Sequence, residues 1–136
     1  MATILAPSAK KPVYNGTHGN LSAVIAEASV NVKDGDEIVL AKLDVGVKLA
    51  RIVLSAEALG SGVSGAIKLK PKGETAVTVI ASASLATAAV KDSDEAGWFP
   101  ASLLQVKHDV VLQLTGANVT GKKVKYRIET ISEGNL

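Results

Sequence analysis

The chain has 136 residues, 47% of them hydrophobic and 3% aromatic, and its 15 basic and 13 acidic side chains give a formal charge of +2. This length suits one domain with one core, and so small an excess of charge lacks the concentrated basic stripe of a nucleic-acid-binding protein. The chain has no cysteine, which excludes disulfides and thiolate sites, and no apolar run reaches the ~20 residues of a membrane helix. We therefore expect a soluble protein of a reducing compartment that binds neither nucleic acid nor a membrane.

Residues 1–17 are expected to form an extended N-terminal arm. They include Pro7 and Pro12 and show no usable hydrophobic period. The apolar side chains of this arm gain nothing by staying in water, and they are the first candidate interface residues: Ile4, Leu5, Val13 and Tyr14. The alternative is that the arm lies on the surface of its own domain, and the sequence leaves both arrangements open.

Strands are predicted through the first half of the remaining chain. Leu21–Val32 is rich in β-branched residues and bounded by turns. Glu37–Leu43 and Val47–Ser55 carry apolar residues on both faces, which is typical of buried central strands. Ile67–Lys70 alternates apolar and charged residues and ends at Pro71, which has no N–H to donate. We expect the breaks between strands to be turns formed by glycine, asparagine and aspartate.

The second half continues with period two. Residues 74–90 are ambiguous, and we expect a strand over Val77–Ile80 followed by a short irregular or helical piece. Val110–Leu114 and Val124–Ile128 alternate apolar and polar residues as strands with one wet face do. Strands that recur about every ten residues predict an all-β fold, an antiparallel sandwich or barrel. Residues 18–136 are expected to form this single β-sandwich domain.

The motifs that resemble catalytic or ligand sites are explained by local structure. Gly60–Gly65 fits G-x-G-x-x-G, but a strand pattern follows it where a dinucleotide site needs a helix. His18 and His108 have no partner in the sequence pattern for acid–base chemistry, and both are expected at the surface. Turn chemistry accounts for the acidic clusters Asp34–Glu37 and Asp92–Glu95. We expect no enzyme activity, no cofactor and no metal.

The one large aromatic cluster is Trp98-Phe99-Pro100. Tryptophan is common in binding hot spots, which suggests an interface anchor or a sugar-binding platform. A lone tryptophan in an aromatic-poor β domain is more often part of the core, and that is the interpretation we favour for Trp98. Trp98 and Phe99 complete the set of candidate interface residues.

Two stretches of this pattern are similar to a known family. Residues 32–73 place a D-G-D turn before a strand, a short Leu43–Gly46 loop before a second strand, and an Ala58–Gly60 turn before a third. Residues 110–126 (VVLQLTGANVTGKKVKY) resemble the closing strand pair of the same family. From the Asp34 turn onward the chain resembles small virion structural proteins of tailed bacteriophages.

This resemblance implies a jelly-roll sandwich that decorates or cements the outside of a phage head. The implied partners are the major capsid protein and other copies of the chain, as a homo-oligomer on the particle. The implied location is the outer surface of the virion, after synthesis in the host cytoplasm. Two alternatives stay open, a carbohydrate-binding β-sandwich module and a neck or tail component of a virion. A sugar site usually needs several exposed aromatic residues or a metal, and the chain is short of both.

Overall fold

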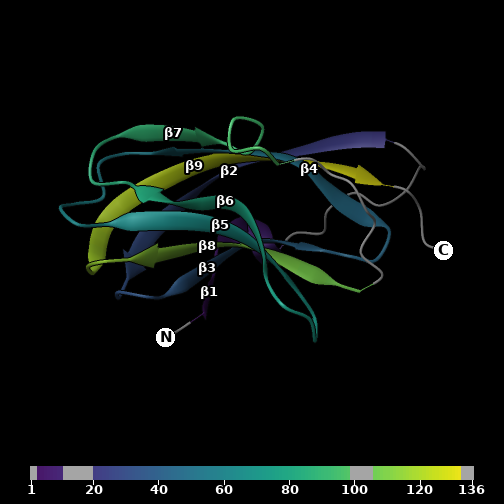
Figure 1. The fold of residues 1–136 in the computed structure, drawn as a ribbon, viewed down its shortest axis with the longest axis horizontal. Helices are drawn as coiled ribbons and strands as arrows, with labels where there is room; N and C mark the ends of the chain where they lie inside the picture. The colour runs from purple at the N-terminus through teal and green to yellow at the C-terminus, as the bar shows by residue number, and fades with distance from the viewer. Residues whose placement is uncertain (1–2, 11–19, 99–105, 133–136) are drawn as a thin grey trace.

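The computed structural model describes residues 3–10, 20–98 and 106–132, and its strands form two sheets that face each other (Figure 1). The five-stranded sheet holds, in spatial order, β1 (Thr3–Leu5), β3 (Glu37–Leu43), β8 (His108–Thr115), β5 (Ser64–Pro71) and β6 (Val77–Ser84). The four-stranded sheet holds β2 (Asn20–Val32), β9 (Val119–Ser132), β4 (Val47–Ala56) and β7 (Ala89–Asp92). One short 3₁₀ helix, η1 (Pro7–Lys10), follows β1.

The connections alternate between the two sheets. From β2 to β5 every connection crosses from one sheet to the other, β6 stays beside β5, and the chain then crosses again at β7, β8 and β9. All strand pairs are antiparallel except β1 with β3. Strands β2 to β9 therefore form a jelly roll, two Greek keys wound into a double sheet. The predicted all-β antiparallel sandwich is confirmed.

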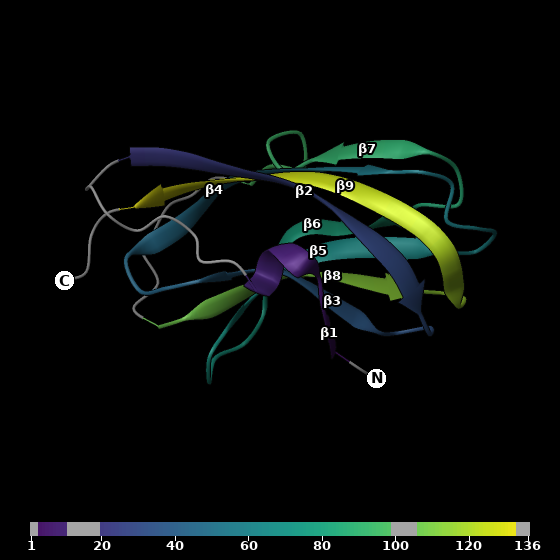
Figure 2. The same ribbon diagram turned by 180° about the vertical axis from the view of Figure 1, so that it is seen from behind.

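Period-two burial builds the core between the sheets. The inward side chains of β9 are at most 2% exposed, namely Val124, Tyr126 and Ile128. Lys125 and Arg127, which alternate with them, are exposed to water, so the two faces of this one strand separate the core from solvent. Figure 2 shows β9 curving across the back of its layer between β2 and β4. The predicted burial of Glu37–Leu43 is confirmed, since β3 is buried on both faces except at Lys42.

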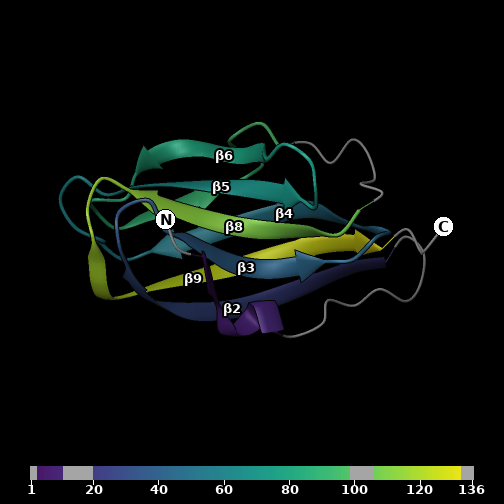
Figure 3. The same ribbon diagram turned by 90° about the horizontal axis from the view of Figure 1, so that it is seen from below.

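The arm begins with a strand that the sequence did not predict. Thr3–Leu5 pairs in parallel with residues 37–39 of β3, and the N–H of Ala6 donates to the carbonyl of Val39 at 2.9 Å. Helix η1 follows on the same side of the sandwich (Figure 3). Its Ala9 forms a small cluster with Val39 and Val111, which are 1% exposed although they are separate from the main core. The described part of the arm thus lies on its own domain, the alternative that the sequence left open.

The ambiguous stretch over residues 74–90 contains two strands. The expected strand over Val77–Ile80 is present and extends to Ser84 as β6. The irregular piece covers only residues 85–88, because β7 begins at Ala89 and pairs with the end of β4. The sequence did not predict β7, since four residues of mixed polarity at a sheet edge carry no readable period.

Two turns meet at one end of the sandwich, and each has a glycine at the meeting point. Gly62 and Gly116 both have positive φ values, 79° and 100°. A Cβ atom added to Gly116 would lie 1.9 Å from the carbonyl oxygen of Gly62, which is backbone that cannot move aside. Glycine at residue 116 is therefore required both by its backbone conformation and by the close approach of the neighbouring turn.

We expect Gly116→Ala to destabilise the fold by about 3 kcal/mol or more, because the left-handed conformation and the steric overlap add. Gly73→Ala is the matched control: its φ is +76°, but no atom lies within 4 Å of an added Cβ. That control loses only the conformational term, about 1–2 kcal/mol. Urea unfolding of both variants gives the comparison, and equal losses would contradict the close approach of the two turns.

Candidate interaction surface

The structure places three of the six predicted interface residues. Ile4 and Leu5 lie on β1 at the edge of the five-stranded sheet, with exposed fractions of 37% and 40%. Trp98 follows β7 and binds to β4, and both of these strands belong to the four-stranded sheet. Val13, Tyr14 and Phe99 lie outside the described residues. The described candidates therefore belong to two separate parts of the surface and not to one patch.

Trp98 is half-buried and packs against the main core. Its indole N–H donates to the carbonyl of Leu49 at 3.2 Å, and its backbone N–H donates to the carbonyl of Ser93 at 2.9 Å. A buried indole needs such a partner for its one donor. The side chain thus closes the turn after β7 over the core, in the role that we favoured from sequence.

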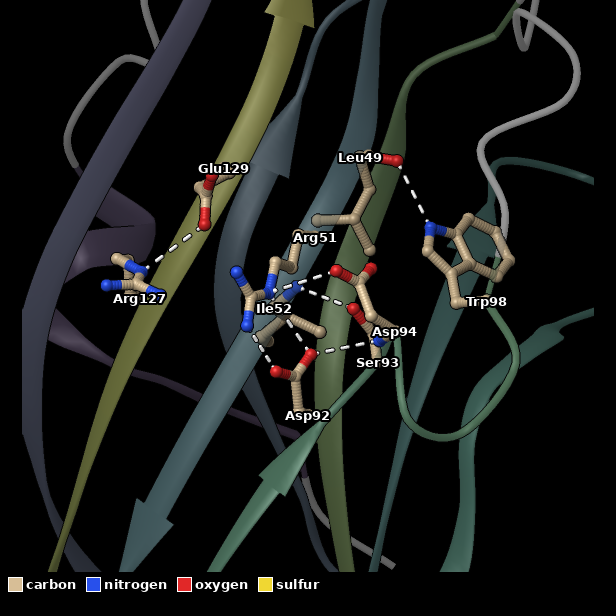
Figure 4. A network of polar contacts seen from close by, with 9 residues as sticks. All are labelled: Leu49, Arg51, Ile52, Asp92, Ser93, Asp94, Trp98, Arg127 and Glu129. Atoms are coloured by element: carbon tan, nitrogen blue, oxygen red, sulfur yellow. Dashed lines mark hydrogen bonds and ion pairs between the residues drawn. The ribbon is translucent and has the colours of Figure 1, made fainter.

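Arg51 joins the turn after β7 to the centre of its sheet (Figure 4). Its guanidinium forms an ion pair with Asp92, whose second oxygen accepts from Arg51 Nε at 3.1 Å, and the same Nε lies 3.3 Å from Asp94. The hydrogen bond from Arg51 lowers the pKa of Asp92, and the same bond raises the pKa of Arg51. Glu129, opposite Arg51 on β9, is paired with Arg127 at 3.3 Å.

Ser93 continues the pairing of β7 beyond its last residue. It is fully buried, its Oγ accepts from the N–H of Ile52 at 2.9 Å, and its own N–H donates to the Ile52 carbonyl at 3.0 Å. Asp92 also accepts from the N–H of Asp94 at 2.9 Å. The carboxylates of Asp92 and Asp94 in this acidic cluster are thus engaged in ion pairs with Arg51 and in a hydrogen bond within the turn.

The other acidic cluster, Asp34–Glu37, is held in the same manner. Asp34 accepts from the N–H of Gly116 at 2.8 Å, and Asp36 accepts from the N–H of Lys33 at 3.0 Å. The carboxylate of Glu37 pairs with Lys70 at 2.7 Å on the outer face of the five-stranded sheet. Within residues 3–10, 20–98 and 106–132, no group of three or more histidine, aspartate or glutamate side chains is placed to hold a metal ion. No helix among these residues is long and apolar enough to cross a membrane.

His108 does not lie at the surface, so that expectation is wrong. It is 2% exposed at the start of β8, and its Nδ1 lies 3.2 Å from the carbonyl of Val106, which assigns the proton to Nδ1. Its Nε2 is buried without a hydrogen-bond partner. A second proton would therefore create a buried donor with no acceptor, and burial lowers the pKa of His108. His18 lies outside the described residues.

Exposed large apolar side chains gather on the sheet edges. All six such side chains in the described part of the chain belong to edge strands: Ile4 and Leu5 on β1, Leu21 and Ile25 on β2, Val77 on β6 and Val90 on β7. The outward positions inside the sheets are instead mostly charged or polar. One open pocket of about 450 Å³ lies over the four-stranded sheet, and Glu27, Glu57, Lys123 and Lys125 supply its charges. This arrangement of the described residues is suited to contact along the edges of the sheets.

Comparison with solved structures identifies chains of the same fold. A chain of the capsid of Ralstonia phage GP4 aligns with a TM-score of 0.66 at 13% identity, covering 96% of this chain and 97% of that one. A chain of the cyanophage Pam1 capsid asymmetric unit gives 0.57 at 13% identity, covering 92% and 96%. A chain of the acid-stable capsid of Helicobacter pylori bacteriophage KHP30 gives 0.55 at 17% identity, covering 87% and 92%.

The likeness extends over nearly the whole of each chain, so the compared chains share one complete jelly-roll sandwich with this protein. No protein-family model and no curated protein matches the sequence. The shared feature is therefore the fold, at 13–17% sequence identity.

The free energy of unfolding should fall as the pH drops below about 6.5, because the unfolded chain then binds a proton that folded His108 excludes. The loss should begin near the ordinary histidine pKa and grow as the pH falls toward the lowered pKa of the folded state. His108→Phe keeps a ring but cannot titrate, so its unfolding free energy should change less over the same range. Urea unfolding at several pH values measures both slopes. If the unfolding free energies of the wild type and His108→Phe changed equally with pH, the assignment of this pH dependence to His108 would be contradicted.

Removing the Arg51 guanidinium should loosen the turn after β7. In Arg51→Met the N–H of Ser93 and the N–H of Trp98 should exchange with solvent several-fold faster, because the ion pairs that fix Asp92 are lost. The single tryptophan of the chain should also fluoresce at longer wavelength as its ring becomes wetter. Asp94→Asn is the control, because Asp94 is 56% exposed and its loss should change little. An unchanged fluorescence spectrum in Arg51→Met would contradict the role of Arg51 in holding the turn after β7.

Proposed function

We propose that this protein is a non-enzymatic structural protein of a bacteriophage virion that binds the outside of an assembled capsid and decorates or cements it. The observation that carries the proposal is the end-to-end likeness in fold to a chain of the capsid of Ralstonia phage GP4. The likeness to chains of two further phage capsids supports it. In each case the match covers more than nine-tenths of the other chain, so the matched capsid chains are themselves little more than one such sandwich.

The described surface is suited to binding by contact. Charged groups on the faces are largely paired within the chain, as in the contacts of Arg51 with Asp92 and of Lys70 with Glu37. Apolar side chains are exposed at the edges, where a neighbouring subunit would cover them. A protein that binds only the assembled shell stabilises it by mass action. Weak single contacts suffice, because many identical copies act on one particle.

Within this function we propose Ile4 and Leu5 as contact residues for the major capsid protein. They project from β1 while Ala6 and Ala9 hold the arm to its own domain. Val13, Tyr14, Trp98 and Phe99 stay as proposed contacts from the sequence. Deleting the arm is a poor test, because it would expose Val39 and Val111 and weaken the fold.

A double substitution of the exposed pair tests the proposal directly. Ile4→Ser with Leu5→Ser should weaken binding to particles that lack the protein by at least about tenfold, or ~1.4 kcal/mol. Thermal unfolding of the free variant should stay close to that of the wild type, since both side chains are already more than a third exposed. Co-sedimentation with purified particles measures the binding.

Val77→Ser with Val90→Ser is the control pair, because these side chains are exposed to a similar or greater degree on two of the other three edge strands, β6 and β7. If both double variants bound particles as tightly as the wild type, Ile4 and Leu5 on β1 would not be part of the interface. No binding of the wild type to particles would overturn the capsid role. Counting copies on native particles by mass spectrometry distinguishes shell from neck or tail, since hundreds of copies indicate the shell and a dozen or fewer the tail.

A further inference from the structure

The outer edge of β2 is the longest unpaired strand edge in the described part of the molecule. β2 runs from Asn20 to Val32 and is the last strand of its sheet. It pairs with β9 without a register shift as far as Val30. Helix η1 lies beside β2 and β3 on this side of the sandwich (Figure 3), but no described strand pairs with the free backbone groups of β2. Such groups are a template for another strand.

The other three edges carry the devices by which proteins protect an exposed strand. β1 has three residues, and β7 has four, two of them Lys91 and Asp92. β6 is interrupted by two register shifts against β5. Short length, charge and irregular register all oppose the addition of a strand. The segment Asn20–Ala26 of β2 has none of them, because it contains no charged residue, no proline and no bulge.

The side chains on the outward face of this segment are apolar and exposed. Leu21 is 61% exposed and Ile25 is 78% exposed, and Ala23 between them is also exposed. Glu27 is the next outward residue and the first charge on the strand. A monomer leaves these two large side chains in water, where each costs free energy that a neighbouring apolar surface would recover.

We propose that two copies of the chain pair antiparallel through Asn20–Ala26, about a two-fold axis at Ala23. In this register Leu21 lies opposite the partner's Ile25, Ile25 lies opposite the partner's Leu21, and the small Ala23 meets its own mate. Glu27 falls beyond the paired segment. A register centred on Glu27 would instead set two carboxylates against each other, which is unfavourable. Apolar pattern and charge thus select one self-complementary pairing, as an isologous interface requires.

This dimer joins the four-stranded sheets of two copies into one continuous sheet and leaves no long unprotected edge in either copy. It does not rest on the capsid role, because the pairing involves only this chain. Its failure in solution would leave the binding of particles untouched, and the two proposals are tested by separate measurements.

A single cysteine at the axis tests the register, because the wild-type chain contains none. Across an antiparallel pair the Cα atoms lie about 4.5–5.5 Å apart, which a disulfide can span. Ala23→Cys should therefore form a disulfide-linked dimer on mild oxidation. Ser29→Cys is the control, since it is exposed on the same face of the same strand. In the proposed register the two control cysteines are about 40 Å apart, and they should cross-link at least about tenfold more slowly.

Sedimentation measures whether the chain dimerises without a disulfide cross-link. The wild type should dimerise as its concentration rises, and Ile25→Lys should weaken the dimer at least about tenfold by placing a charge against the partner's Leu21. Val90→Lys is the matched control, a 63% exposed valine on another edge, and should leave dimerisation unchanged. Circular dichroism confirms that both variants fold. A wild type that stays monomeric, equal cross-linking at residues 23 and 29, or an unaffected Ile25→Lys dimer would each overturn the proposal.

Discussion

Strand β9 fixes the register of one entire layer of the sandwich. It lies between β2 and β4, and it pairs with β2 along nearly its whole length and with β4 from Val124 to Ser132. Because side chains alternate strictly along a strand, a slip of one residue would turn Tyr126 and Ile128 to water and bring lysines into the core. The positions of β2 and β4 follow from β9, and with them the inward side chains that face the other sheet. The rest of the core depends on this alternation.

The same alternation explains which strands could be predicted from sequence. β5, β8 and β9 alternate apolar and polar residues, whereas β3 and β4 carry apolar residues on both faces, and each strand appears where its pattern predicts. β1 has only three residues, and its partner is more than thirty positions away in the chain. β7 has four residues and is stabilised by its pairing with β4 and by the hydrogen bonds of Ser93. The local sequence pattern does not predict pairing with strands that are distant in the chain. The jelly-roll order likewise came from a family resemblance and not from the periodicity.

The site residues show the same division between local and distant causes. The burial of His108 had a signal, because it shares the parity of Val110 and Leu112 on β8, and the surface assignment overlooked it. The contacts of Arg51 had no signal in the sequence, because Asp92 and Asp94 are brought to it only by the pairing of β7 with β4. Ile4 and Leu5 were chosen as apolar residues in an irregular arm. Their exposure depends on which parts of that arm fold back onto β3, and composition does not determine this.

The pairing of β2 with β9 also has a consequence for synthesis of the chain. Asn20 lies opposite Ser132, so β2 is made long before the strand with which it pairs. β4 waits for the same strand. While the ribosome works, two apolar strands therefore remain without their central neighbour, a state that favours slow closure and contact with other chains. A message truncated before Val119 would remove the middle of the four-stranded sheet, and with it one of the two layers.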